Sequence, residues 1–269
     1  MMSHILAWLL GVSALTPAPP VQAVAAAAIR IEANDGGLSL PPRLTAGLTT
    51  FSVENTGTGP HDVRFARITD THTVADVAAW LKTGGAVPSW LVTAGGAGAL
   101  MPGAKEEYTF NVAPGSYIVL CTHRGDDGAT HAEKGGYAAL QVDAGTSTLR
   151  APVADRIVTL RDHGFQLTAP VEGGRSTFHV RNTGSEPHQM LIVKLQDAGG
   201  EYPERAWFNH GARGARPGQA AGGVLEVPPG DEAWVRVDLG PGHYLLVCAE
   251  QEEDGQHLDL GMIYRFTIE

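Results

Sequence analysis

The chain has 269 residues, a formal net charge of −10 and 43% hydrophobic residues. This length predicts two small domains, and no apolar run reaches the roughly 18 residues that a membrane-spanning helix needs. The 19 Lys and Arg residues form no basic run, which argues against a nucleic-acid partner. With 34 Gly, 17 Pro and 18% charged residues, the composition favours an all-β protein of short strands and turns.

Residues 1–23 have the pattern of a signal peptide. They contain no Asp, Glu, Lys or Arg, and an apolar run from Ile5 to Leu15 is followed by prolines and the small-residue site Val21-Gln22-Ala23. We therefore expect export, cleavage near Ala23 and a mature protein in the periplasm or outside the cell. Such compartments are oxidising, so two free cysteines there require a physical explanation.

The remaining chain alternates apolar and polar residues in short runs that predict β-strands. Such runs occur at 50–53, 61–65, 108–112 and 116–120. One short helix is expected over 73–81, where Thr73 opens a capping box and apolar residues follow at helical spacing. About seven such strands are expected in each half of the chain. That number predicts a two-sheet Greek-key β-sandwich in each half, because antiparallel sheets must bury one face.

The second half of the chain repeats the first with an offset of 127 residues. The matching pairs include Asp35/Asp162, Asn55/Asn182, His61/His188, Trp80/Trp207, Tyr117/Tyr244 and Cys121/Cys248. Near the end the offset becomes 126, for His131 and His257. We therefore predict two tandem domains, residues 29–147 and 153–269, with a second short helix over 203–209.

In the second copy, four residues have the chemistry of a copper site. His188 begins a predicted strand, Cys248 ends a later one, and His257 and Met262 follow in the next loop and strand. Two imidazoles and a thiolate in a plane, with a weak axial thioether, are the ligands of an electron-transfer copper site. These four residues are the predicted C-terminal metal ligands.

The first copy carries a weaker version of the same set. His61, Cys121 and His131 are present, but Gly136 stands where Met262 stands in the second copy. Such a site would hold copper in a three-ligand plane, take an oxygen ligand axially, or be degenerate.

Each ligand also has a purely structural interpretation. Cys248 would serve as a small buried apolar residue or form a disulfide with Cys121, and Met262 would be a core residue. A sandwich that has lost its metal is therefore an alternative.

The order Asn-Thr-Gly, Pro-His, then Cys, His and Met resembles the cupredoxins, the blue copper proteins, and among them exported bacterial cupredoxin-domain proteins. The resemblance covers both copies and implies a copper cofactor and a cupredoxin-like sandwich in each. It also implies that Asn182, and Asn55 at the matching position, help to hold the ligand loop by hydrogen bonds.

Two related classes of copper enzyme need further ligands. Multicopper oxidases use His-x-His pairs and a His-Cys-His segment, and copper nitrite reductases have a His directly before the Cys. Here Leu120 and Val247 stand before the two cysteines. The sequence therefore predicts a protein that is not an enzyme by itself.

The ligand loops are acidic, with Glu250, Glu252, Glu253 and Asp254 in one copy and Asp126 and Asp127 in the other. This charge predicts a redox partner with a basic patch. The function expected from the sequence is one-electron transfer through the C-terminal copper. The alternatives are a metal-free binding protein and a copper carrier or chaperone.

Overall fold

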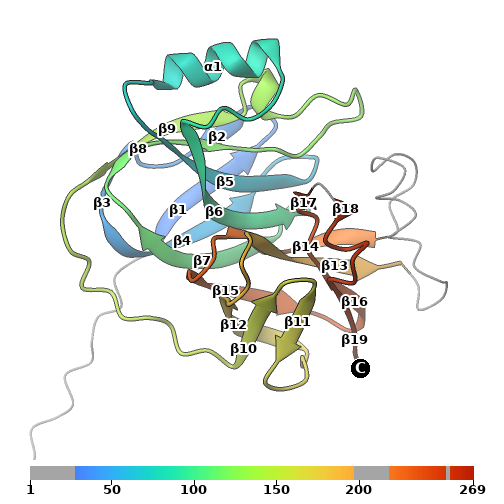
Figure 1. Ribbon diagram of the computed structural model, residues 1–269. Coiled ribbons are helices and arrows are strands. Elements are labelled where there is room, and N and C mark those ends of the chain that lie inside the picture. The colour runs from blue at the N-terminus through green and yellow to red at the C-terminus, as the bar shows by residue number, and fades with distance from the viewer. Residues whose placement is uncertain (1–27, 197–217, 253–254) are drawn as a thin grey trace, which may run out of the picture.

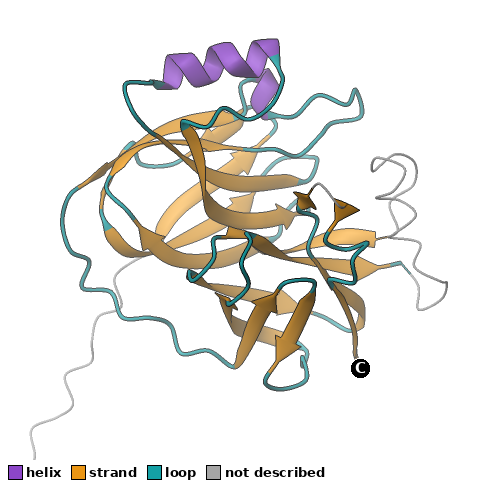
Figure 2. Cartoon of the chain, in the orientation of Figure 1, coloured by secondary structure: helices purple, strands orange, loops and turns teal. Residues whose placement is uncertain are grey.

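A computed structural model describes residues 28–196, 218–252 and 255–269 of the chain. The predicted signal peptide, the predicted helix over 203–209, and Glu253 and Asp254 lie outside the described residues. Within the described part, the protein is built mainly of strands (Figures 1 and 2). The composition-based prediction of a mostly β protein is therefore confirmed.

The strands of the two halves follow the same order along the chain. The first half contains β1 (Ile29–Asn34), β2 (Gly37–Ser39), β3 (Arg43–Thr45), β4 (Gly47–Asn55), β5 (His61–Ile68), α1 (Val74–Thr83), β6 (Leu91–Leu100), β7 (Lys105–Val112), β8 (Gly115–Leu120), the 3-10 helix η1 (Ala132–Lys134) and β9 (Tyr137–Asp143). The second half contains β10 (Arg156–Arg161), β11 (Gly164–Leu167), β12 (Gly174–Asn182), β13 (His188–Leu195), β14 (Gly218–Val227), β15 (Glu232–Leu239), β16 (Gly242–Val247), β17 (Gln251–Glu252), β18 (Gly255–Gln256) and β19 (Ile263–Ile268).

Both main sheets run through the two halves. The described strands form one sheet in the order β11-β10-β12-β15-β7-β4-β1-β2 and another in the order β19-β16-β13-β14-β6-β5-β8-β9-β3. The halves meet where β15 pairs with β7 and β14 pairs with β6, both antiparallel. The tandem halves therefore share their sheets, because this pairing satisfies strand edges that would otherwise be exposed.

The core lies between the two sheets and includes residues of both halves. Alternation along β4 and β12 turns Phe51 and Phe178 inward, where both are fully buried in one apolar cluster. Near the end of each half, a tyrosine hydroxyl donates to a backbone carbonyl four residues earlier: Tyr117 to Ala113 at 2.9 Å and Tyr244 to Gly240 at 2.8 Å. These bonds fasten corresponding turns to the strands that precede the cysteines.

The predicted helix is present as α1, which lies on the outer side of the first half (Figure 1). Thr73 and Asp76 form the expected capping box, and Val77 and Leu81 are buried in a second apolar cluster with residues of β5 and β8. Among the described residues, no helix is both long and apolar enough to cross a membrane.

Because the halves share sheets and core, we expect the mature chain to unfold in a single cooperative transition. Phe51→Ala and Phe178→Ala should each lower the free energy of unfolding by about 3–5 kcal/mol, the usual cost of truncating a buried Phe. Differential scanning calorimetry with chemical denaturation measures both. Two separate transitions, with each substitution shifting a different one, would contradict the shared core.

Candidate metal centres

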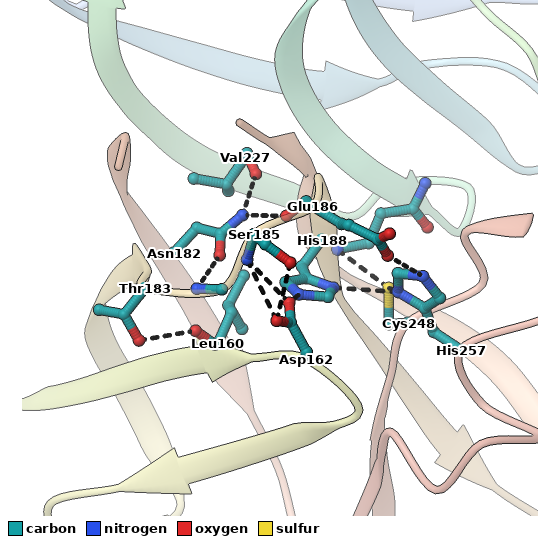
Figure 3. A network of polar contacts seen from close by, with 12 residues as sticks. Leu160, Asp162, Asn182, Thr183, Ser185, Glu186, His188, Val227, Cys248 and His257 are labelled. Atoms are coloured by element: carbon teal, nitrogen blue, oxygen red, sulfur yellow. Dashed lines mark hydrogen bonds and ion pairs between the residues drawn. The ribbon is translucent and has the colours of Figure 1, made fainter. Parts of the chain in front are cut away.

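Three side chains of the C-terminal half converge at one place (Figure 3). His188 begins β13, Cys248 directly follows β16, and His257 directly follows β18. The Nδ1 atoms of the two histidines lie 3.0 Å apart, and Sγ of Cys248 lies 3.4 Å from Nδ1 of His257. All three residues are at most 1% exposed. The fold thus brings together, in a water-poor site, three of the four residues named from the sequence.

The far nitrogen of each histidine faces a carboxylate. Nε2 of His188 lies 3.0 Å from Oδ1 of Asp162, in the β10–β11 turn, and Nε2 of His257 lies 3.5 Å from Glu186. The hydrogen bond from His188 is the main cause that lowers the pKa of Asp162, while burial lowers the pKa of His188 itself. An ionised Asp162 therefore accepts from Nε2–H of a neutral His188, which leaves the Nδ1 lone pair on the side of the cluster, where Nδ1 of His257 lies 3.0 Å away.

The Cys248 thiol is shielded from solvent. It is fully buried, and the backbone N–H of Gln189 donates to its Sγ at 3.2 Å. Burial raises the pKa of Cys248 to about 12, because the thiolate loses its hydration. Without a metal, the thiol stays protonated and poorly reactive. Such a thiol would resist oxidation in the oxidising compartment that the sequence leads us to expect.

Met262 directly follows the turn that begins at His257. It is fully buried in the core cluster that contains Cys248. Its backbone N–H donates to the His257 carbonyl at 2.9 Å, and its carbonyl accepts from the Cys248 N–H at 3.2 Å. The backbone thus ties Met262 to two of the three converging residues.

Asn182 and Asn55 hold the loops that precede the first histidines. The Asn182 amide nitrogen donates to the carbonyls of Glu186 and Val227, at 2.6 and 2.7 Å. Asn55 makes the matching bonds to Gly59 and Leu100, at 2.8 and 2.7 Å. Each asparagine therefore fixes the approach to β13 or β5, as the family resemblance implies.

The N-terminal half assembles a second cluster from His61, Cys121 and His131. Sγ of Cys121 lies 3.6 Å from Nδ1 of His61 and 3.4 Å from Nδ1 of His131, and the two Nδ1 atoms are 3.0 Å apart. Burial raises the pKa of Cys121 far above its usual range. Nε2 of His61 lies 3.1 Å from Asp35, the counterpart of Asp162. His131 is partly exposed, in contrast to His257.

Both clusters fit a small metal ion by donor type and spacing. Three donors in a plane, each about 2.0–2.3 Å from one ion, would lie about 3.5–4.0 Å from one another. The measured separations of 3.0–3.6 Å approach this, so closing on an ion needs small movements of the donors. In each cluster all ligand atoms lie within 4.8 Å of one another. The cysteines are free, so the alternative of a Cys121–Cys248 disulfide is wrong.

Sequence reasoning missed the acidic partners of the histidines. Asp35 and Asp162 were noted as a repeated pair, but their contact with His61 and His188 was not foreseen. The available signal was their place in the repeat, at the same distance before each histidine. Nothing in the spacing alone says that a turn carboxylate meets an imidazole from another strand.

A buried polar network links the C-terminal cluster to the other half. The Gln189 amide nitrogen donates to Glu226 at 3.1 Å and also to Glu250, and Arg64 of β5 forms an ion pair with Glu226. Burial raises the pKa of Glu250.

In the matching N-terminal loop, Asp127 pairs with Lys134 at 2.7 Å. Two of the acidic loop residues are thus engaged within the molecule.

The sequence matches no family model and no curated protein. Solved structures similar to it include reduced auracyanin from Roseiflexus castenholzii, with 23% identity over 44% of this chain and 98% of that chain, TM-score 0.31. A multicopper oxidase has 13% identity over 89% of this chain and 88% of that chain, TM-score 0.26. Copper nitrite reductase from Nitrosomonas europaea has 15% identity over 89% and 93%, TM-score 0.24.

Another similar structure, auracyanin A from the green thermophilic photosynthetic bacterium Chloroflexus aurantiacus, is described as a blue copper protein. The expected resemblance to cupredoxins is confirmed, and it concerns the fold alone. What the two clusters do is argued from this chain's own residues.

The prediction that the chain is not an enzyme is wrong as it was drawn. The similar structures that span 89–90% of this chain include multicopper oxidases and a copper nitrite reductase, which are enzymes. The prediction relied on missing ligand motifs, and a missing motif excludes one way of building a catalytic site without excluding others.

The burial of both thiols predicts their reactivity. A rise in the Cys248 pKa from 9.0 to about 12 lowers the thiolate fraction at pH 8 by roughly 1000-fold. In the metal-free Cys121→Ser variant, Cys248 should therefore react with a disulfide reagent at least 100-fold more slowly than a small free thiol. Urea-unfolded protein, the control, should react at the ordinary rate. Rapid reaction in the folded state would contradict a buried thiol.

Proposed function

We propose that this is an exported copper protein that transfers single electrons through a type 1 site in its C-terminal half. In this proposal, residues 29–147 and 153–269 are two copies of a cupredoxin-like Greek-key sandwich. The observation that carries it is the convergence of His188, Cys248 and His257 in a buried site, with Met262 bonded to the same loop. That donor set is the one that favours copper in an electron-transfer role.

The residues around the cluster have definite tasks in this function. His188, Cys248 and His257 would hold the copper, which supplies one-electron redox chemistry when it is bound. Asp162 orients His188, and the Gln189 N–H to Sγ stabilises a cysteine thiolate. Because these contacts come from both sheets and their turns, the ligands stay in place when the charge of the centre changes. Small rearrangement favours fast electron transfer.

The acidic residues of the ligand loops support a basic redox partner. Glu250 and Asp127 already have internal contacts. At the C-terminal site, the carboxylates of Asp162 and Glu186 contact His188 and His257 but keep 43% and 42% of their surface exposed to a partner. In the N-terminal loop, Asp126 is exposed. Association through such charges would weaken as salt concentration rises.

The decisive experiment is visible absorption and EPR spectroscopy of the mature protein, purified reduced and given one to two equivalents of Cu(II). We expect an intense thiolate-to-copper absorption band. Cys248→Ser should remove the part of the band that comes from copper in the C-terminal half, and Cys121→Ser should remove any part that comes from copper in the N-terminal half. Full retention of the band in Cys248→Ser would overturn the C-terminal assignment. Copper left free in solution would favour a metal-free binding protein. Tight Cu(I) binding with slow electron exchange would favour a carrier.

Met262→Gln tests the axial position. A harder oxygen donor stabilises Cu(II), so the reduction potential of the C-terminal copper should fall while copper binding is retained. Cyclic voltammetry in the Cys121→Ser background isolates this site. The control is Met262→Leu, which keeps the apolar volume and lacks the donor. An unchanged potential in both variants would show that Met262 is not a ligand.

A further inference from the structure

The two clusters have different residues at one position where their backbone hydrogen bonds match. Gly136 donates its N–H to the His131 carbonyl at 2.8 Å and accepts from the Cys121 N–H at 2.9 Å. Met262 makes the same two bonds with His257 and Cys248. The N-terminal cluster therefore keeps the frame that carries the thioether in the other half, but has no side chain there.

A small hollow is found at this cluster. Its volume is about 30 Å³, and it is lined by Asn34, Asp35, Gly37, His61, Cys121, His131, Lys134 and Gly136. That is enough room for at least one water molecule. The three candidate metal ligands thus form part of the wall of a space that is open on one side, where Asp35 and Lys134 are exposed.

Among the described residues, the candidate ligands of the C-terminal cluster are less exposed. His188, Cys248, His257 and Met262 are each at most 1% exposed, whereas His131 is partly exposed. A metal ion held by three protein ligands with an open position accepts a fourth ligand from solution, and a fully enclosed ion does not.

From these observations we propose that the N-terminal centre binds a small exogenous ligand, a water molecule or a monodentate anion with a nitrogen or oxygen donor, beside Gly136. This inference rests on the proposed function, since it requires copper at His61, Cys121 and His131. The charge of the centre favours an anion, because Cu(II) with one thiolate and two neutral imidazoles carries a net positive charge. The size of the hollow excludes bulky ligands. The two halves then have different roles. The enclosed C-terminal site exchanges electrons, and the accessible N-terminal site binds a ligand.

The test uses azide as the probe and isolates each site by substitution. The mature Cys248→Ser chain reports the N-terminal centre, and Cys121→Ser reports the C-terminal centre, each loaded with one equivalent of Cu(II). We expect azide to shift the absorption and EPR spectra of the N-terminal centre in a saturable way. For the C-terminal centre, the azide concentration that gives half of any spectral change should be at least about tenfold higher than for the N-terminal centre. The double Cys→Ser variant controls for adventitious copper.

The reciprocal variant is Met262→Gly in the Cys121→Ser background. It should make the C-terminal centre responsive to azide, whereas Met262→Leu, which restores apolar volume without a donor, should not. If Met262→Gly fails to fold, the comparison of the two single-site proteins alone decides the proposal.

The outcomes separate the two proposals. A thiolate-to-copper band from Cys121 that azide does not alter, or equal azide responses from both halves, would overturn the open-site inference and leave the copper function intact. Absence of any band from Cys121 would overturn the inference together with copper binding in the N-terminal half, while the C-terminal tests would stand.

Discussion

The hydrogen bond between a turn carboxylate and the first histidine of each cluster is the contact on which both sites depend. Asp162 lies between β10 and β11 in one sheet, and His188 begins β13 in the other. The bond therefore joins the two layers, and it also leaves Nδ1 as the histidine nitrogen that is available to the cluster. Asp35 and His61 repeat this arrangement. A donor set assembled in this way exists only after both sheets have closed on the core, so folding and metal affinity are coupled.

The shared sheets connect each cluster to the whole molecule. Because β6 pairs with β14 and β7 with β15, each half supplies the neighbour that covers the other's strand edges. The clusters lie at the ends of strands that belong to these continuous sheets. Their ligands are therefore held by the whole molecule, and the rigidity needed around a redox centre does not depend on one small sandwich alone.

Much of this architecture is predictable from the sequence, and the reasons are particular. Period-two alternation identified strands such as β4 and β8, the capping box at Thr73 identified α1, and the repeat located corresponding histidines and cysteines that do meet in space. The continuity of the sheets was not foreseen, because edge pairing depends on how two surfaces match and leaves no local pattern. The carboxylate partners were missed for the same reason: Asp162 and His188 are 26 residues apart and meet only through the fold.

The junction between the halves has an evolutionary consequence. Arg64, Glu226 and Gln189 form its buried polar network, but their counterparts at the offset of 127 residues are Leu191, Ala99 and Asp62. If two copies of the first half paired in this way, each Arg64 would face the other copy's Ala99. If two copies of the second half did so, each Glu226 would face the other copy's Leu191. An unpaired buried charge costs several kcal/mol. The two halves are therefore complementary at this junction and not interchangeable, so the junction selects fusion in one chain rather than self-association of a single half.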